Sequence, residues 1–341
     1  MRIHSSMNLR QLATCAALTL ASIAATPPEP RDAGPFTRAL WLIQRHGTLD
    51  AADPRNDITT KGSLARALGK DGILKPAGVK GLIDPNTFAK LAGTDERLDP
   101  SEIQNVVEAD LPESRRRLLP AIVAHADFLT TSFDRIDEVH RAAGETLSDW
   151  IVDNYQPGKP LPVTVICTGN SRRSILGSTL GNIAAAYYGM PEIRFHSGGT
   201  APSAFNPRTI TALREIGVEV EPTGEQAPRG EPSTANPIYR VRWGTPGEPS
   251  FEATEFSKTY FNPVNPHQGF AALMVCGEAD EACPLVKGAS VRISMPYLDP
   301  KIFDESPYEA AKYAERRDDM GRLMLASLLR AKQRISARKP G

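Results

Sequence analysis

The sequence lacks an excess of charge of either sign, because its 40 lysine and arginine residues balance 40 aspartate and glutamate residues. Nucleic-acid-binding domains usually carry a basic excess, so the composition predicts no nucleic-acid partner. The chain also lacks an internal repeat, and its N-terminal apolar run, residues 12–25, is too short to span a bilayer. Cysteine is scarce, with only four residues: Cys15, Cys167, Cys276 and Cys283.

The first 25 residues have the layout of a secretory signal. Arg2 and Arg10 precede the apolar run, which ends in small residues, and Ser22 to Ala24 would serve as the cleavage motif. This pattern predicts a periplasmic or other extracytoplasmic protein without stable membrane insertion after signal removal; if the segment is not a functional signal, the protein is cytoplasmic. Removal of residues 1–25 leaves three cysteines, an odd number that fits one nucleophile and one redox-capable pair.

The organisation of the chain changes near residue 157. Residues 34–157 are expected to form a mainly helical region of unknown role, with amphipathic runs near 113–128 and 136–152. A Pro- and Gly-containing cluster at 156–160 marks the expected boundary of a catalytic domain over residues 160–335. Within this domain, residues 219–261 are rich in Pro, Gly and Glu and are expected to form a long surface excursion.

Beyond residue 160, short β-rich runs alternate with helical runs. This alternation is typical of βαβ units and predicts an α/β fold, a four-stranded parallel sheet flanked by helices. The expected strands are residues 162–166, 193–196, 271–275 and 291–295, and the expected helices are 174–188, 206–216 and 306–331.

The strongest motif is a cysteine that ends the first β-rich run and is followed by five residues, an arginine, a serine and a helix. Five intervening residues can curl so that their backbone N–H groups face one tetrahedral oxyanion, at the positive end of the helix. A buried cysteine before an ordinary helix start would not require this spacing. The motif consists of Cys167, Thr168, Gly169, Asn170, Ser171, Arg172, Arg173 and Ser174.

The residue types within this loop suit oxyanion chemistry. Gly169 and Asn170 tolerate backbone conformations that other residues avoid. Arg173 presents a planar fork for two anion oxygens. The same N–H groups and charge stabilise a thiolate at Cys167, the predicted nucleophile, to which Ser174 can donate. The intervening residues are therefore predicted to bind the substrate oxyanion, and no metal or cofactor is required.

The loop resembles the active-site loop shared by low-molecular-weight protein tyrosine phosphatases and thioredoxin-coupled arsenate reductases. The likeness extends, in order, over about half of the chain. Many members carry a second cysteine just before the loop arginine; Arg172 holds that position here, which excludes a protective disulfide inside the loop. The later segments that carry the likeness are Ser197 to Thr200, Asn206 to Gly217, and Asp299 with Pro300.

The resemblance also implies a general acid. In these families an Asp-Pro pair lies on a loop over the site and protonates the leaving group, which assigns this role to Asp299. Asp304 is the nearest alternative carboxyl group. Phosphatases that act on phosphotyrosine tend to place aromatic residues directly after the pair, whereas Lys301 and Ile302 stand there in this chain.

The spacing of Cys276 and Cys283 resembles the redox segment of the arsenate reductases. In a parallel sheet of this order the first and third strands end side by side, so Cys276 is expected to approach Cys167. The resemblance implies a relay in which Cys167 attacks arsenate, Cys276 forms a disulfide with Cys167, and Cys283 then takes over that disulfide for a thioredoxin-like reductant. An oxidising compartment would instead favour a permanent Cys276–Cys283 disulfide.

Three functions follow from these features. The leading hypothesis is a thiol-relay arsenate reductase. The alternative is a phosphatase that hydrolyses phosphomonoesters through a cysteinyl-phosphate at Cys167, with Cys276 and Cys283 in a structural role. A third hypothesis is an oxyanion-binding module without turnover.

Overall fold

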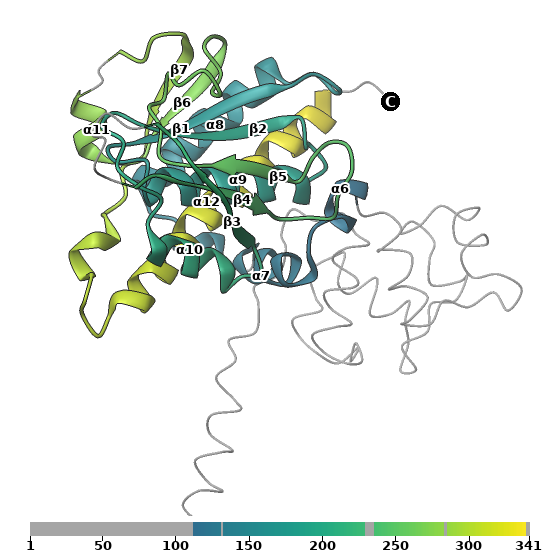
Figure 1. Ribbon diagram of the computed structural model, residues 1–341. Helices are drawn as coiled ribbons and strands as arrows, with labels where there is room; N and C mark the ends of the chain where they lie inside the picture. The colour runs from purple at the N-terminus through teal and green to yellow at the C-terminus, as the bar shows by residue number, and fades with distance from the viewer. Residues whose placement is uncertain (1–111, 131, 229–234, 283–284, 339–341) are drawn as a thin grey trace, which may run out of the picture. The chain divides into compact units, whose positions relative to one another are not determined.

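Strand β1, Leu161–Cys167, lies inside a four-stranded parallel sheet with the order β2-β1-β6-β7 (Figure 1). The computed structural model describes residues 112–130, 132–228, 235–282 and 285–338. The predicted signal, residues 34–111 and Cys283 lie outside these ranges. The other sheet strands are β2 (Ile193–Gly199), β6 (Phe270–Met274) and β7 (Ala289–Ser294).

The predicted α/β fold with a four-stranded parallel sheet is confirmed, and each strand lies where its β-rich run was expected. All five residues of β6 are buried, because central strands of a parallel sheet are covered on both faces. Helices connect or flank the strands: α9 (Arg173–Tyr187), α10 (Pro207–Arg214), α11 (Gly277–Ala282), η5 (Pro300–Phe303) and α12 (Glu309–Arg338).

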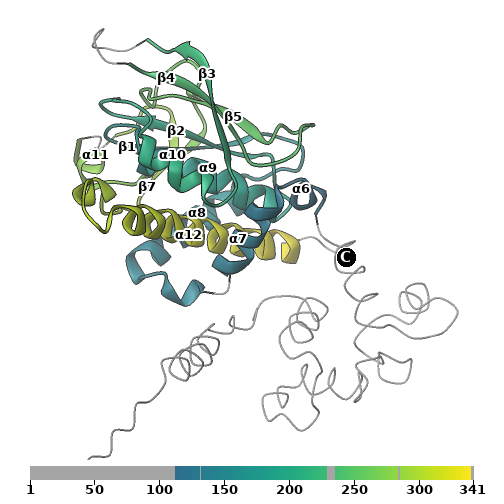
Figure 2. The ribbon, with the colours of Figure 1, turned by 60° about the horizontal axis from the view of Figure 1, so that its bottom comes forward.

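The segment before β1 is helical and belongs to the same compact unit as the sheet. It forms α6 (Glu113–Arg116), α7 (Pro120–Thr130), η4 (Phe133–Arg135) and α8 (Glu138–Asn154). Helix α12 contacts α7, α8 and α9, and Figure 2 shows it running beside them. The boundary expected near residue 157 therefore falls inside one unit, residues 110–341. The cluster at 156–160 is only a turn between α8 and β1.

The prediction of a long surface excursion over residues 219–261 is wrong in one respect, because much of this segment forms a second sheet. Strands β3 (Glu219–Gln226), β4 (Pro237–Arg242) and β5 (Glu252–Glu255) pair antiparallel in that order. Trp243, directly after β4, and Phe251, directly before β5, are buried. Beyond β5, the N–H groups of Gly199 and Tyr260 bond to the carbonyls of Lys258 and Gly199, at 2.9 and 3.0 Å, so this region covers the edge strand β2.

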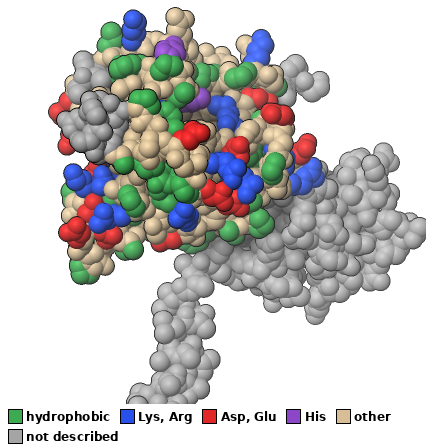
Figure 3. All heavy atoms as spheres, in the orientation of Figure 1, with side chains coloured by type: hydrophobic (Ala, Val, Ile, Leu, Met, Phe, Trp, Pro, Cys, Tyr) green, Lys and Arg blue, Asp and Glu red, His purple; other side chains and the backbone are tan. Residues whose placement is uncertain are grey.

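The surface charges and the helix hydropathy of the described residues bear on two possible partners, nucleic acid and membrane. Figure 3 shows basic and acidic side chains interspersed over the face that it presents. None of the helices within the described ranges meets the length and hydropathy of a bilayer span.

Candidate active site at the ends of β1 and β6

The predicted oxyanion-binding motif, residues 167–174, is called the oxyanion loop below and lies where β1 ends and α9 begins. Cys167 is the last residue of β1, and α9 starts at Arg173, so the loop surrounds the positive end of a fifteen-residue helix. Cys167 is 3% exposed and Ser174 is fully buried. The side chain of Arg173 is also mostly buried. The structure thus brings together the predicted nucleophile, the arginine and the serine that the sequence singled out.

The carbonyl groups of the loop are occupied by a neighbouring segment, residues 200–206. The C=O and N–H groups of a peptide unit point in opposite directions. Loop carbonyls that bond to residues 200–206 therefore leave loop N–H groups available to donate to an anion on the other side. The four bonds run from Thr200 N to Cys167 O (3.1 Å), Ala201 N to Thr168 O (2.9 Å), Ser203 N to Gly169 O (2.8 Å) and Asn206 N to Ser171 O (3.1 Å).

Two glycines at the end of β2 allow this close packing. A Cβ atom on Gly199 would lie 2.5 Å from the Thr168 carbonyl oxygen, and one on Gly198 would lie 2.5 Å from Tyr260 Cα. Both distances are too short for any side chain. The Ser197 to Thr200 segment therefore has a steric role, since it lets the backbone approach the oxyanion loop.

Asn170 holds the inside of the loop. Its φ of +41° is rare outside glycine and is tolerated best by Asn and Asp. Its Nδ2 donates to Ser174 Oγ at 2.9 Å, and its Oδ1 accepts from Lys258 N at 2.8 Å. Ser174 Oγ lies 3.1 Å from Cys167 Sγ. Because Ser174 Oγ accepts from Asn170, its own proton is free to point at the sulfur and stabilise a thiolate.

A buried ion pair lies in the segment that contacts the loop through Lys258 N, and the sequence reasoning missed it. Lys258 Nζ is 2.9 Å from Glu255 Oε2 and 3.2 Å from Ser197 Oγ, with side-chain exposures of only 3% and 6% for the ion pair. Both residues stand in the segment expected at the surface, and no sequence signal marks a lysine as buried. Burial lowers the pKa of the nearby His196 to about 4, so its imidazole is neutral.

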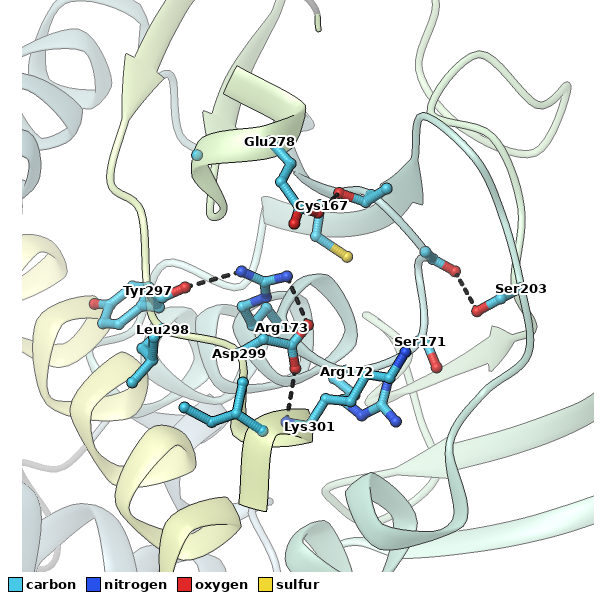
Figure 4. Close-up of a pocket in the computed structure, with 14 residues that line it drawn as sticks. Cys167, Ser171, Arg172, Arg173, Ser203, Glu278, Tyr297, Leu298, Asp299 and Lys301 are labelled. Carbon is cyan, nitrogen blue, oxygen red and sulfur yellow. Dashed lines mark hydrogen bonds and ion pairs between the residues drawn. The ribbon is translucent and has the colours of Figure 1, made fainter. Parts of the chain in front are cut away.

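The predicted acid, Asp299, faces the loop. Arg173 Nη2 donates to Asp299 Oδ2 at 2.7 Å, and Arg173 Nη1 donates to the Tyr297 carbonyl at 2.9 Å (Figure 4). Asp299 also accepts from Lys301 N at 3.0 Å, which caps η5. Arg173 Nε is buried and has no partner within the described residues. An oxyanion in the loop would offer it one.

Arg172 and Asp304, two residues that the sequence singled out, contact each other. Arg172 lines the pocket, and its role in substrate binding stays a prediction; its Nη2 donates to Asp304 Oδ2 at 3.1 Å and its Nε donates to the Tyr313 hydroxyl at 2.7 Å. Asp304, the alternative acid, is thus occupied by Arg172. It is absent from the residues that line the pocket.

Cys276 lies beside the loop. The pairing of β1 with β6 places Ile166 opposite Met274, and Val275 N donates to Ile166 O at 2.9 Å. Cys276 Sγ is 3.3 Å from Thr168 Oγ1, the residue that follows the nucleophile. Both Cys167 and Cys276 are free thiols. The expected approach of the two strand ends is therefore observed, although Cys283 is not described.

Cys167, Arg173 and Asp299 line an open pocket of about 560 Å³, whereas Cys276 is not among its lining residues (Figure 4). Among the described residues, no group of three or more His, Cys, Asp or Glu side chains is placed to hold a metal. Glu278, which sequence reasoning did not single out, also faces the pocket, and its carboxylate accepts from Thr168 Oγ1 at 3.1 Å. The lining residues are Cys167, Thr168, Gly169, Ser171, Arg172, Arg173, Ser203, Gly277, Glu278, Tyr297, Leu298, Asp299, Lys301 and Ile302.

A comparison with protein-family models and with curated proteins gave no match to this chain. The chemical interpretation of the site therefore rests on its own residues and on the motif resemblance.

Proposed function

We propose that this chain is an arsenate reductase of the thiol-relay type, related to the low-molecular-weight phosphatases and thioredoxin-coupled arsenate reductases that its loop resembles. The observation that carries the proposal is a second free thiol at the oxyanion loop, Cys276, whose sulfur lies 3.3 Å from Thr168 Oγ1. A hydrolase of this loop chemistry needs one thiol only, whereas a two-electron reduction needs two.

In the first step the Cys167 thiolate attacks the arsenic(V) atom of arsenate, which forms an S–As bond. One arsenate oxygen leaves as water, with a proton from Asp299. The loop N–H groups and Arg173 hold the remaining oxygens, so Arg173 exchanges part of its contact with Asp299 for the anion.

In the second step Cys276, as a thiolate, attacks the sulfur of Cys167. A Cys167–Cys276 disulfide forms, the S–As bond breaks, and its electron pair stays on arsenic, which leaves as arsenite, arsenic(III). Cys283 then attacks Cys276, which frees Cys167 as a thiolate and leaves a Cys276–Cys283 disulfide. An external dithiol of the thioredoxin class reduces that disulfide. Export to an oxidising compartment remains a prediction, and it would require such a reductant there.

The test uses the fully reduced protein with arsenate under single-turnover conditions. We expect two thiols to be lost for each arsenite released. The Cys276→Ser variant should form the Cys167 adduct without releasing arsenite, and Cys283→Ser should release one arsenite and then stop. Arsenite released by Cys276→Ser at the wild-type rate would contradict the relay.

The pocket favours one alternative, a phosphatase. Its volume of about 560 Å³ lies within the range of small-molecule sites, roughly 300–1,000 Å³, and exceeds what a bare oxyanion at the loop fills. Leu298 and Ile302, which are 58% and 64% exposed, add apolar walls that suit an organic leaving group. Steady hydrolysis of an aryl phosphate by wild type, Cys276→Ser and Cys283→Ser, without arsenite formation, would support this function instead.

A further inference from the structure

The guanidinium of Arg172, which stands where many relatives of this loop type carry a second cysteine, lines the pocket but is bonded to protein groups. Two of the three guanidinium nitrogens of Arg172 have partners: Nη2 donates to Asp304 Oδ2 at 3.1 Å, and Nε donates to the Tyr313 hydroxyl at 2.7 Å. The exposed fractions of the Arg172 and Asp304 side chains are only 14% and 20%. The contact is therefore partly shielded from water, which strengthens it relative to a surface ion pair.

Tyr313 completes a closed three-residue arrangement, which we name the Arg172 clamp: Arg172, Asp304 and Tyr313. Tyr313 is 2% exposed on α12, and its hydroxyl donates to Asp304 Oδ1 at 2.8 Å. Burial raises the pKa of Tyr313 to about 12, so the hydroxyl keeps its proton at neutral pH and can accept from Arg172 while donating to Asp304. The three hydrogen bonds of the clamp therefore have mutually compatible donor and acceptor directions.

Arg208 and Glu309 support the clamp from its outer side. Arg208 Nη1 lies 3.7 Å from Asp304 Oδ2, and Arg208 Nε lies 2.7 Å from Glu309 Oε2. Glu305, directly after Asp304, has a φ of +63°, and its N–H donates to Glu309 Oε2 at 2.6 Å. A positive φ at a residue other than glycine persists only where neighbouring contacts hold it.

The segment held in this way carries the acid. Asp299 and Asp304 bracket η5, so fixing Asp304 fixes Asp299 to within one short turn. Apolar packing contributes little there, because Leu298 and Ile302 are exposed and only Pro300 of η5 is buried. Polar contacts therefore anchor this segment on the oxyanion loop: Arg173 holds Asp299 and the Tyr297 carbonyl, and the Arg172 clamp holds Asp304.

We propose that Arg172 is a positioning residue whose side chain holds Asp299 over the oxyanion through the Arg172 clamp, and that its guanidinium does not bind the oxyanion. Adjacent arginines thereby divide two tasks: Arg173 binds the anion, and Arg172 fixes the acid. This inference rests on the proposed role of Asp299 as general acid, which is common to the reductase and the phosphatase.

The test is a double-mutant cycle on the full chain, with Arg172→Ala, Asp299→Asn and the double variant. We expect Arg172→Ala to slow turnover by roughly 10- to 100-fold, because a misplaced acid loses part of the 10²–10⁴-fold that acid catalysis contributes. The double variant should be no slower than Asp299→Asn alone, because the clamp acts through that carboxyl group. Arg172→Lys, which keeps the charge but not the fork, should recover only part of the rate.

Binding separates positioning from anion recognition. Protection of Cys167 from alkylation by inorganic phosphate should be within about threefold of wild type in Arg172→Ala, whereas loss of an anion-binding arginine would weaken it by ten-fold or more. The control is Arg240→Ala, which removes an arginine from an exposed ion pair with Glu221 and should leave rate and binding unchanged. Equal losses in phosphate binding and in rate, or additive losses in the cycle, would overturn the proposal.

Amide hydrogen exchange tests the Arg172 clamp without any turnover, so its result does not depend on the proposed reductase function. Amide hydrogen exchange of Arg172→Ala should increase over residues 298–306 and stay unchanged over residues 200–206. If arsenite is not formed, the same cycle is run on aryl phosphate hydrolysis, so loss of the reductase proposal does not remove the test. Unchanged exchange at 298–306 would contradict the clamp, whichever reaction the protein catalyses.

Discussion

The two free cysteines lie at the ends of adjacent strands, yet their surroundings differ. Cys167 follows β1, receives the Ser174 hydroxyl at 3.1 Å and precedes the fifteen-residue helix α9. Cys276 follows β6 and precedes the six-residue helix α11, with the Ala279 N–H at 3.4 Å. Its other neighbour, Thr168 Oγ1, also donates to the carboxylate of Glu278. Similar sheet positions can therefore hold sulfurs with different tasks.

This difference supports the proposed order of attack. Cys167 lies in the loop whose N–H groups, together with Arg173 and Ser174, suit an oxyanion, so we propose that it attacks arsenate first. Cys276 is fully buried and shares Thr168 Oγ1 with the carboxylate of Glu278. In the proposed relay it therefore attacks the neighbouring sulfur of Cys167 in the second step.

The largest expected effect separates the two cysteines directly. Cys167→Ser should lower turnover by at least about 10⁴-fold, because the nucleophile is lost. Cys276→Ser should still form a covalent adduct at Cys167, visible by intact-protein mass spectrometry. Residual turnover in Cys167→Ser above one thousandth of wild type would show that Cys167 is not the nucleophile.

The next effect concerns the buried ion pair between Lys258 and Glu255. Lys258→Met leaves the buried Glu255 carboxylate without its cation and should lower the free energy of unfolding by about 3–5 kcal/mol, measured by urea denaturation. Lys258→Met combined with Glu255→Gln should recover most of that loss, because no buried charge remains. A single variant that loses under about 1 kcal/mol would contradict the account of this ion pair.

A smaller effect tests the hydrogen bond that distinguishes Cys167. Ser174→Ala should slow alkylation of Cys167 by iodoacetamide at about pH 6 by roughly 10- to 100-fold, as a hydrogen bond to a charged group stabilises it by about 1.5–3 kcal/mol. The matched control is Ser178→Ala, one turn further along α9, whose hydroxyl donates to the Ile175 carbonyl. Equal slowing in both variants would indicate a general disturbance of α9.

The smallest effect is a pH dependence at His196, beside the buried ion pair. Its pKa is about 4 in the folded chain against about 6.5 when unfolded, so the unfolded state binds more protons below pH 6.5. Stability should therefore fall as the pH drops, by about 2 kcal/mol from this group between pH 7 and pH 5. His196→Gln should remove this part of the pH-dependent loss in the free energy of unfolding. An unchanged pH dependence in that variant would show that His196 is not its source.

The parallel sheet and the oxyanion loop were predictable because their signals are local. Each strand is a short β-rich run between turns, and the loop spacing depends on one strand end and one helix start. The N-cap of α10 is a local contact of the same kind, with Asn206 Oδ1 accepting from Arg208 N at 2.9 Å.

The remaining structure depends on contacts between distant residues. Strands β3 to β5 have few buried positions along their own sequence, so their Pro- and Gly-containing pattern suggested a loop. The Pro- and Gly-containing cluster at 156–160 is typical of a linker, so the sequence predicts a separate region before it. In the structure α7 and α8 pack against α12, a helix at the other end of the chain that local patterns do not connect to them. The task of Arg172 likewise depends on Asp304 and Tyr313, more than 130 positions away.

The most direct test of the central claim is to trap the disulfide between the two strand ends. Reduced Cys283→Ser is mixed with one equivalent of arsenate, quenched with an alkylating reagent and mapped by peptide mass spectrometry. The account predicts a Cys167–Cys276 disulfide in the same amount as the arsenite released. Free, alkylated Cys276 in protein that has released arsenite or hydrolysed an aryl phosphate would contradict the relay.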